Sequence, residues 1–284
     1  LVIAVPLVIE KIYKSKVKPI LEKEGVRVLM KLPVLSQMVM NKIREELVNA
    51  FGGEFYQVII GGAAFNKEVE AFFKKIGFPV TVGYGMTECA PIITYDDWNV
   101  EKLYSCGKAA PNLEIRIDSS DPANVPGEIL VRGANVFLGY FKNDDATDSV
   151  FTDDGWFKTG DMGVIDEDGC LFIKGRTKCM ILGPSGQNIY PEEVETVLNS
   201  QPYVVESLVV EDNGGLTALI YPDFQQGAKD GMSQDAFIRY IEGLLPELNK
   251  ELPNYAKLKK IEVMSEAFER TPKKSIKRYL YQRN

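Results

Sequence analysis

The segment Val82-Gly83-Tyr84-Gly85-Met86-Thr87-Glu88 carries residue types suited to binding a flat, phosphorylated ligand. Two glycines beside a tyrosine predict a sharp turn that brings the backbone and the aromatic ring against a planar group. The hydroxyl of Thr87 and the carboxylate of Glu88 would then face a phosphate and its metal ion. Turns of this composition usually only reverse the chain, so the rest of the sequence must decide between the two interpretations.

A second polar segment, Gly155-Trp156-Phe157-Lys158-Thr159-Gly160-Asp161, ends in a carboxylate that follows a glycine at the start of a predicted strand. Asp161 could accept two hydrogen bonds from a sugar diol, although an aspartate in such a place more often forms a turn. Further along, Gly175-Arg176-Thr177-Lys178 adds two cations. On its own, Lys178 would be an ordinary surface lysine.

The composition excludes several kinds of catalysis. The 284 residues include no histidine, which rules out Ser-His-Asp and Cys-His catalysis and imidazole metal sites. The four cysteines show neither a zinc spacing nor a disulfide framework, so we expect reduced thiols in a cytoplasmic protein. The net charge of −7 disfavours nucleic-acid binding, and nothing in the sequence indicates an obligatory protein partner.

Alternating strands and helices are predicted around the first segment. The order is strand, glycine-rich turn, helix, strand, which favours a parallel sheet with ligands at the carboxyl ends of its strands. The predicted strands cover residues 1–5, 57–60 and 79–82, and the predicted helices cover residues 6–23, 35–50 and 66–76.

The predicted secondary structure changes in type at residue 107. Short alternating strands, predicted over 114–117, 128–132, 162–165 and 170–174, indicate a small antiparallel barrel or sandwich. The remainder alternates strands with helices. We therefore expect α/β plus α+β architecture: a parallel-sheet α/β subdomain over 1–106, a small β-barrel over 107–177, and a small α+β domain over 178–284.

Four separated motifs stand in one order in this sequence: Tyr84-Gly85-Met86-Thr87-Glu88, Gly155-Trp156-Phe157-Lys158-Thr159-Gly160-Asp161, Gly175-Arg176-Thr177-Lys178 and Gly186-Gln187-Asn188-Ile189-Tyr190-Pro191-Glu192-Glu193-Val194-Glu195. Together they resemble the adenylate-forming superfamily of acyl-CoA synthetases, nonribosomal adenylation domains and luciferases. The resemblance extends to Pro126-Gly127-Glu128-Ile129-Leu130-Val131-Arg132-Gly133 and Gly139-Tyr140-Phe141. Within the superfamily the chain looks most like the long-chain fatty acyl-CoA ligases, on the basis of the helical stretch over 6–53 and the segment Gly61-Gly62-Ala63-Ala64-Phe65-Asn66.

The resemblance implies an ATP-dependent ligase that converts a fatty acid to an acyl-adenylate and then to an acyl-CoA. Its small-molecule substrates would be the fatty acid, ATP and coenzyme A, with Mg²⁺ as cofactor. Tyr84 would stack on the adenine, while Thr87 and Glu88 would reach the α-phosphate and magnesium. The adenine would also be lined by Gly62, Ala63 and Ala64.

Asp161 would bind the ribose hydroxyls in the same scheme. Lys178 would be the hinge about which the family's C-terminal domain rotates, and Gly186 would line the pantetheine channel. Attack of a carboxylate on the α-phosphate needs charge neutralisation more than proton transfer, which agrees with the lack of histidine. The nucleotide site would be completed by Gly85, Met86, Ile173 and Arg176.

Two features depart from the family's pattern. The Ser/Thr/Gly-rich phosphate loop, which the family carries upstream of the Tyr84 motif, is not among these residues. We therefore expect residues 1–177 to be the C-terminal portion of the AMP-binding N-terminal domain and the chain alone to be inactive. In the family's C-terminal lysine motif, Ser275 occupies the lysine position, so Lys274 or Lys277 could serve instead.

Two alternatives stay open. One is a fatty-acyl or aryl-acid adenylating ligase that acts on a carrier protein, and the other is a non-catalytic nucleotide-binding or interaction module. No run reaches the roughly 20 apolar residues of a membrane span. We expect a cytoplasmic protein whose amphipathic, lysine-rich N-terminal region could contact the inner membrane face.

Overall fold

The computed structural model describes residues 1–183, 186–271 and 275–283. The chain divides into two compact units, Leu1–Ile173 and Lys174–Asn284, and each has its own hydrophobic core. The first unit contains a parallel α/β part and an antiparallel sheet, and the second is α+β, so the predicted fold class is confirmed. The sequence places the domain boundary between residues 177 and 178, slightly beyond this division after Ile173. The assignment of domains to these ranges stays a prediction.

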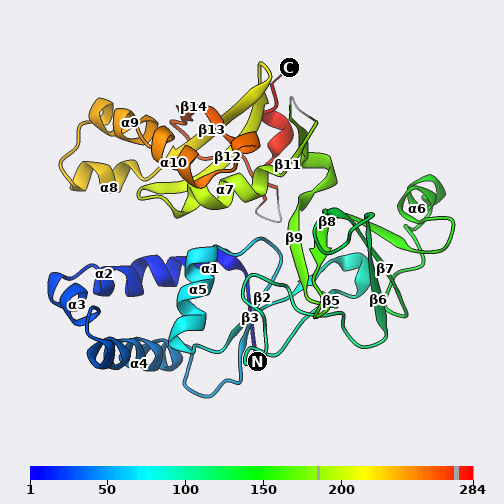
Figure 1. Cartoon of the computed structure of the whole chain (residues 1–284), viewed down its shortest axis with the longest axis horizontal. Helices are drawn as coiled ribbons and strands as arrows, with labels where there is room; N and C mark the ends of the chain where they lie inside the picture. The colour runs from blue at the N-terminus through cyan, green and yellow to red at the C-terminus, as the bar shows by residue number, and fades with distance from the viewer. Residues whose placement is uncertain (184–185, 272–274, 284) are drawn as a thin grey trace. The chain divides into compact units, whose positions relative to one another are not determined.

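A three-stranded parallel sheet organises the first part of unit one. Its order is β1 (Val2–Ala4), β2 (Val58–Ile60) and β3 (Val80–Val82), with β2 in the centre. Figure 1 shows the helices of this part grouped beside the sheet. They are α1 (Pro6–Ile12), a π-helical turn (Tyr13–Val17), α2 (Lys18–Leu21), α3 (Glu24–Leu29), α4 (Pro33–Ala50) and α5 (Lys67–Ile76).

Helix α5 connects β2 to β3 and sets the position of the strand end that follows. The Asn66 side chain caps it by accepting from the Val69 N–H at 3.1 Å, and Gly77 ends it in the left-handed conformation at φ 68°. Phe73 of α5 and Phe78, which precedes β3, are each 1% exposed in the same core. The carboxyl end of β3 therefore extends from a rigidly packed helix–strand unit.

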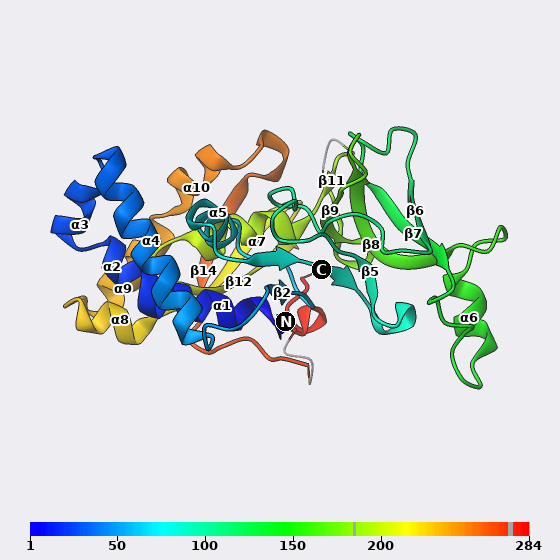
Figure 2. The ribbon, with the colours of Figure 1, turned by 90° about the horizontal axis from the view of Figure 1, so that it is seen from below.

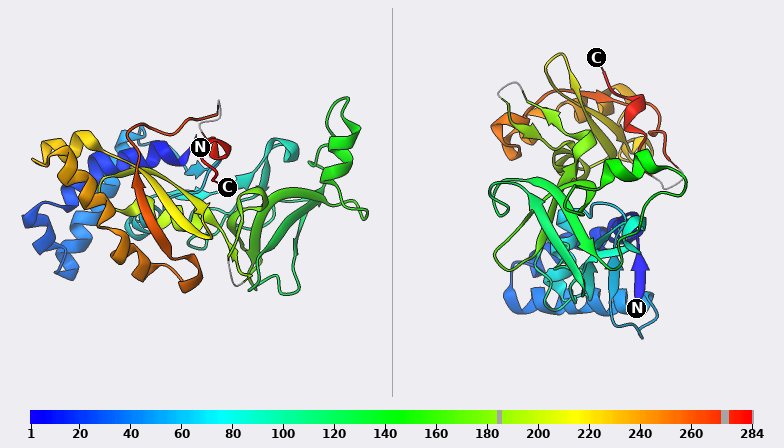
Figure 3. Two further views of the ribbon diagram at one scale, coloured as in Figure 1. Left: turned by 90° about the horizontal axis from the view of Figure 1, so that it is seen from above. Right: turned by 90° about the vertical axis from the view of Figure 1, so that its right-hand side faces the viewer.

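The antiparallel part is an open sheet, not the expected barrel. Its order is β6 (Leu113–Asp118), β7 (Gly127–Gly133), β8 (Phe157–Ile165) and β9 (Leu171–Arg176). Within the described residues, β6 and β9 form the two edges and do not pair with each other. Four strands are too few to close a barrel around a filled interior, which takes about eight in simple barrels. Helix α6 (Asp144–Val150) projects beyond this sheet (Figures 2 and 3).

Unit two is built on a mixed sheet. Strands β12 (Val204–Asp212) and β13 (Gly215–Pro222) are antiparallel, and β14 (Leu258–Val263) runs parallel to β13. The other elements are the hairpin of β10 (Ile181–Leu182) and β11 (Asn188–Ile189) and the helices α7 (Pro191–Ser200), α8 (Phe224–Lys229), α9 (Gln234–Glu242) and α10 (Leu245–Glu251). Helix α9 ends with Gly243 as its C-cap, and α10 begins at Leu245.

In the part of the chain that the structure describes, no helix is both long and apolar enough to cross a bilayer.

Candidate functional site

The segment singled out in the sequence forms a tight turn directly after β3. Gly83 N–H donates to the Ile60 carbonyl of β2 at 2.9 Å, and β4 (Tyr84–Gly85) then pairs with β5 (Ile92–Thr94). Between β4 and β5, residues Thr87–Cys89 make one 3₁₀ turn. Thr87 and Glu88 thus lie in the turn between β4 and β5, and their contact with a phosphate and its metal ion stays a prediction.

Gly85 is required here by a close approach of two backbone segments. A Cβ atom at Gly85 would lie 1.9 Å from the Pro91 carbonyl oxygen and 2.8 Å from its carbon. The same carbonyl accepts from the Met86 N–H at 2.8 Å. The glycine therefore permits the β4–β5 turn, independently of any ligand contact.

Two glycine-bearing turns lie side by side at the carboxyl end of the parallel sheet. A Cβ atom at Gly61 would lie 3.4 Å from the Gly83 carbonyl oxygen. Gly62 has φ +88°, and the three residues Gly62, Ala63 and Ala64 are exposed. The loop after β2 thus presents backbone and small side chains next to the Tyr84 turn. Parallel sheets typically bind ligands at this edge, the carboxyl ends of their strands.

Tyr84 and Asp161 meet although 77 residues separate them in the sequence. The Tyr84 hydroxyl donates to Asp161 Oδ2 at 2.7 Å, and the two residues are 9% and 7% exposed. Burial, together with the negative charge of Asp161, raises the pKa of the tyrosine. Tyr84 consequently stays protonated and donates to the carboxylate, which fixes Asp161 beside the turn.

The Glu88 carboxylate is fixed by a tyrosine whose role the sequence did not reveal. Tyr140 Oη donates to Glu88 Oε1 at 3.1 Å, and Phe137 N–H donates to the Glu88 carbonyl at 2.8 Å. The rings of Tyr140 and Phe137 pack edge to face, with centroids 4.8 Å apart. The signal was the Gly139-Tyr140-Phe141 motif, to which the sequence assigned no function.

The remaining predicted residues fall at the end of unit one or in unit two. Ile173 ends unit one and is 38% exposed. Arg176 ends β9, and Lys178 lies exposed in the 3₁₀ turn Thr177–Cys179. Gly186 is exposed with φ +83°. These placements leave the expected roles of the four residues as predictions.

One of the two candidate C-terminal lysines, Lys277, lies among the residues that the structure describes. Lys277 Nζ lies 3.1 Å from Glu269 Oε2, and hydrogen bonding to this carboxylate raises the pKa of the lysine. Lys274 lies outside the described residues. The choice between the two lysines therefore stays open.

Mg²⁺ fits this site only if oxygen atoms of both the protein and the nucleotide bind it. No group of three or more acidic or cysteine side chains able to hold a metal occurs in the ranges that the structure describes. Mg²⁺ typically binds one or two carboxylates and completes its shell with phosphate oxygens and water. A single partly exposed carboxylate, Glu88, beside the exposed Thr87 hydroxyl agrees with that mode of binding.

Comparisons with known proteins agree with this geometry. The family model "AMP-binding enzyme" matches residues 6–141, and the model "AMP-binding enzyme C-terminal domain" matches residues 180–284. The chain belongs to the AMP-binding enzymes. The family resemblance drawn from the motifs is thereby confirmed.

This AMP-binding chain is similar to ligases of different acids. It is 35% identical over 215 residues to a long-chain-fatty-acid–CoA ligase of Mycobacterium bovis, a match that covers 75% of this chain and 34% of that protein. The ATP-bound structure of MatB from Rhodopseudomonas palustris is 27% identical with a TM-score of 0.70, over 98% of this chain and 49% of the other.

The O-succinylbenzoate coenzyme A synthetase of Bacillus subtilis, solved with ATP and a magnesium ion, is 30% identical with a TM-score of 0.66. The match covers 82% of this chain and 49% of that one. This AMP-binding chain therefore spans about a third of the length of the curated relative and about half of each solved structure.

Proposed function

We propose that the protein containing this chain is an ATP-dependent long-chain fatty acid–CoA ligase. The observation that carries the proposal is the Tyr84–Asp161 hydrogen bond, which joins an aromatic turn to a buried carboxylate. An aromatic face and a fixed diol acceptor together suit an adenosine. The similarity to a fatty acid ligase supports the choice of acid.

Each residue of the turn has a separate part in this proposal. The Tyr84 ring and the 62–64 loop bind the adenine, and Asp161 accepts from the ribose hydroxyls. The Thr87 hydroxyl donates to the α-phosphate, while Glu88 holds magnesium. Magnesium held there would neutralise charge on the phosphates as a carboxylate oxygen of the acid attacks the α-phosphorus and the bond to the departing pyrophosphate breaks. No residue has to move a proton in this step.

Residues at the end of unit one and in unit two would complete the nucleotide site and serve adenylation and the later transfer to coenzyme A. We assign Lys178 as the hinge, Gly186 to the pantetheine channel and Arg176, with Ile173, to the nucleotide site. Lys274 or Lys277 would stabilise charge during adenylation. The cytoplasmic location and the contact with the inner membrane face stay predictions from the sequence.

An aryl acid is the second candidate substrate. The similarity to the O-succinylbenzoate synthetase supports it, because that protein is 30% identical to this chain. Adenylation would use the same residues with either acid, so the two candidates differ only in the acyl pocket.

A substrate comparison on the full-length protein tests the proposal. With ATP, Mg²⁺ and coenzyme A, we expect kcat/KM for palmitate to exceed that for 2-succinylbenzoate by about tenfold or more, because an apolar acyl pocket would reject the second, non-reacting carboxylate of 2-succinylbenzoate. Chromatography measures the acyl-CoA that forms. A higher kcat/KM for 2-succinylbenzoate than for palmitate would favour the aryl acid. The absence of any acyl-CoA would refute both candidates.

Replacing Tyr140 by phenylalanine tests the assignment of Glu88 to magnesium. The variant keeps the ring packed on Phe137 but removes the hydrogen bond to the carboxylate. We expect Mg²⁺-dependent ATP binding to weaken by about three- to tenfold, as for loss of one ordinary hydrogen bond. Calorimetric titration with and without Mg²⁺ measures this, and Tyr56→Phe, at an exposed tyrosine bonded to Asp97, is the matched control.

A further inference from the structure

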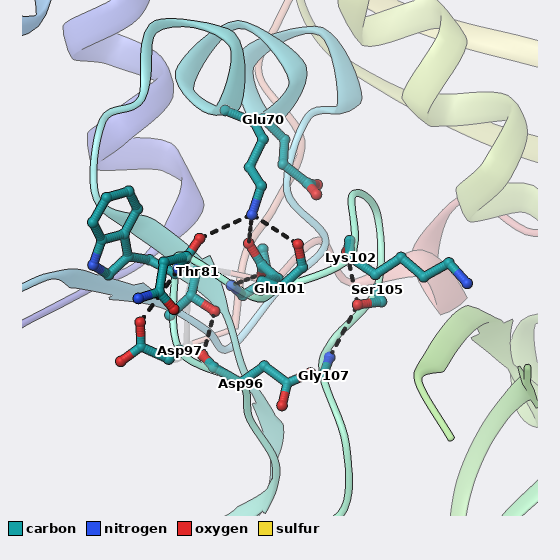
Figure 4. Close-up of polar contacts among 12 residues, drawn as sticks. Glu70, Thr81, Asp96, Asp97, Glu101, Lys102, Ser105 and Gly107 are labelled. Carbon is teal, nitrogen blue, oxygen red and sulfur yellow. Dashed lines mark hydrogen bonds and ion pairs between the residues drawn. The ribbon is translucent and has the colours of Figure 1, made fainter. Parts of the chain in front are cut away.

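The loop of residues 95–107 contacts the outer edge of β3 just before the nucleotide-binding turn. Thr81 Oγ1 donates to the Asp96 carbonyl at 2.8 Å. The Glu101 carboxylate accepts from the backbone N–H of Val82, the last residue of β3. Because β3 is an edge strand, this carboxylate satisfies an amide that a further strand would otherwise pair. Figure 4 shows Thr81, Asp96 and Glu101 in one network.

Glu101 is buried next to charged side chains of α5. Its side chain is 2% exposed, and Lys74 Nζ lies 3.9 Å from its Oε2 and 2.7 Å from its carbonyl oxygen. Glu70 of the same helix is 5% exposed and accepts from the Tyr104 N–H of the loop at 2.6 Å. Lys67, one turn earlier in α5, favours the ionised form of Glu70. Two carboxyl groups thus share one buried region.

This arrangement makes the charge of Glu101 sensitive to pH near neutrality. Burial, with the charge of Glu70, raises the pKa of Glu101 to about 7, although the Val82 N–H and Lys74 oppose the shift. Burial also raises the pKa of Glu70 to about 7. Cys106 faces both carboxylates and remains a neutral thiol, because burial raises its pKa to about 12.

We propose that Glu101 is a positioning residue for the nucleotide-binding turn: its ionised carboxylate fixes the end of β3, and protonation loosens that end. The inference rests on the proposed nucleotide binding. A charge-assisted hydrogen bond is roughly twice as strong as a neutral one, so the Val82 amide is fixed best when Glu101 is ionised. AMP affinity should therefore rise about two- to fivefold between about pH 6 and about pH 8.

The test compares the chain with its Glu101→Gln variant. The amide still accepts from the Val82 N–H but does not ionise, so the variant loses the contribution of Glu101 to the pH dependence. The phosphate of AMP also titrates in this interval, and the informative quantity is therefore the ratio of the two Kd values at each pH, measured by calorimetry. A ratio that stays constant from about pH 5.5 to about pH 8.5 overturns the proposal.

Glu70→Gln is the matched control within the same pair. It removes the like charge that raises the pKa of Glu101, so the midpoint of the affinity profile should move to lower pH. The affinity at high pH should not change, since Glu70 bonds to the loop and not to β3. A midpoint that does not move contradicts the assignment to this carboxyl pair.

Hydrogen exchange separates a failure of this inference from a failure of the proposed function. At about pH 8, the protection of the peptide over residues 80–86 should fall by about five- to tenfold in Glu101→Leu, and by less in Glu101→Gln, which keeps a neutral acceptor for the Val82 N–H. This readout needs no nucleotide. If the wild-type chain binds no AMP, the proposed function fails, and equal protection in all three proteins would refute the positioning role.

Discussion

An Asp161→Ala variant of the chain should bind AMP roughly 30- to 1,000-fold more weakly than the wild type. The estimate corresponds to about 2–4 kcal/mol, the usual range for losing hydrogen bonds from a diol to a carboxylate. Isothermal titration calorimetry measures the loss directly. If Asp161 binds the ribose, 2′,3′-dideoxy-AMP should bind the wild type and the variant with similar, weak affinity, because the hydroxyls that the carboxylate would recognise are absent.

Two controls distinguish this role from a general structural defect. The substitution leaves the buried Tyr84 hydroxyl without its acceptor Oδ2, which costs about 1–3 kcal/mol of stability, so the Tm must be followed in parallel. Asp118→Ala changes an exposed carboxylate at the end of β6 in the same sheet and should alter neither property. Equal loss of AMP and dideoxy-AMP binding would contradict the assignment of Asp161 to the ribose.

Gly85→Ala should disrupt the proposed nucleotide-binding turn, destabilise unit one by about 3 kcal/mol or more, and weaken AMP binding about 100-fold. The added Cβ would overlap the Pro91 carbonyl oxygen at 1.9 Å, so β4 and β5 would have to separate. Tryptophan fluorescence during denaturant unfolding reports on the stability of unit one, because both tryptophans, Trp98 and Trp156, belong to Leu1–Ile173.

Gly83→Ala provides the matched control for that substitution. It adds the same methyl group two residues earlier, where the nearest heavy atoms, Ile59 Cγ2 and the Thr94 carbonyl oxygen, would lie 3.5 Å away. This is ordinary van der Waals contact, and we expect a change in stability below about 1 kcal/mol. A Gly85→Ala protein as stable as Gly83→Ala would show that the β4–β5 approach is not required.

The local parts of the fold were predictable because adjacent residues determine them. The strand–helix–strand unit around α5 follows from apolar periodicity with Asn66 and Gly77 at the helix ends. The barrel prediction failed because closure depends on whether two edge strands meet, and strand periodicity carries no information on this.

The site was only partly predictable for a related reason. Residue types identified Tyr84 and Asp161, but their mutual hydrogen bond depends on packing between segments 77 residues apart. The Glu70 and Glu101 pair was not recognised. A glutamate in a helix or loop usually faces solvent, and nothing local indicates that these two are buried.

The Tyr84–Asp161 bond also limits how this chain can be divided. Tyr84 extends from the parallel sheet and Asp161 lies on the antiparallel one, while the backbones of Cys106 and Gly107 pair with Leu171 between them. Neither sheet alone contains both halves of the proposed adenosine contact. If these residues bind the nucleotide as proposed, recognition is a cooperative property of two folded parts, and separating the chain near residue 106 would remove it without altering any residue of the site.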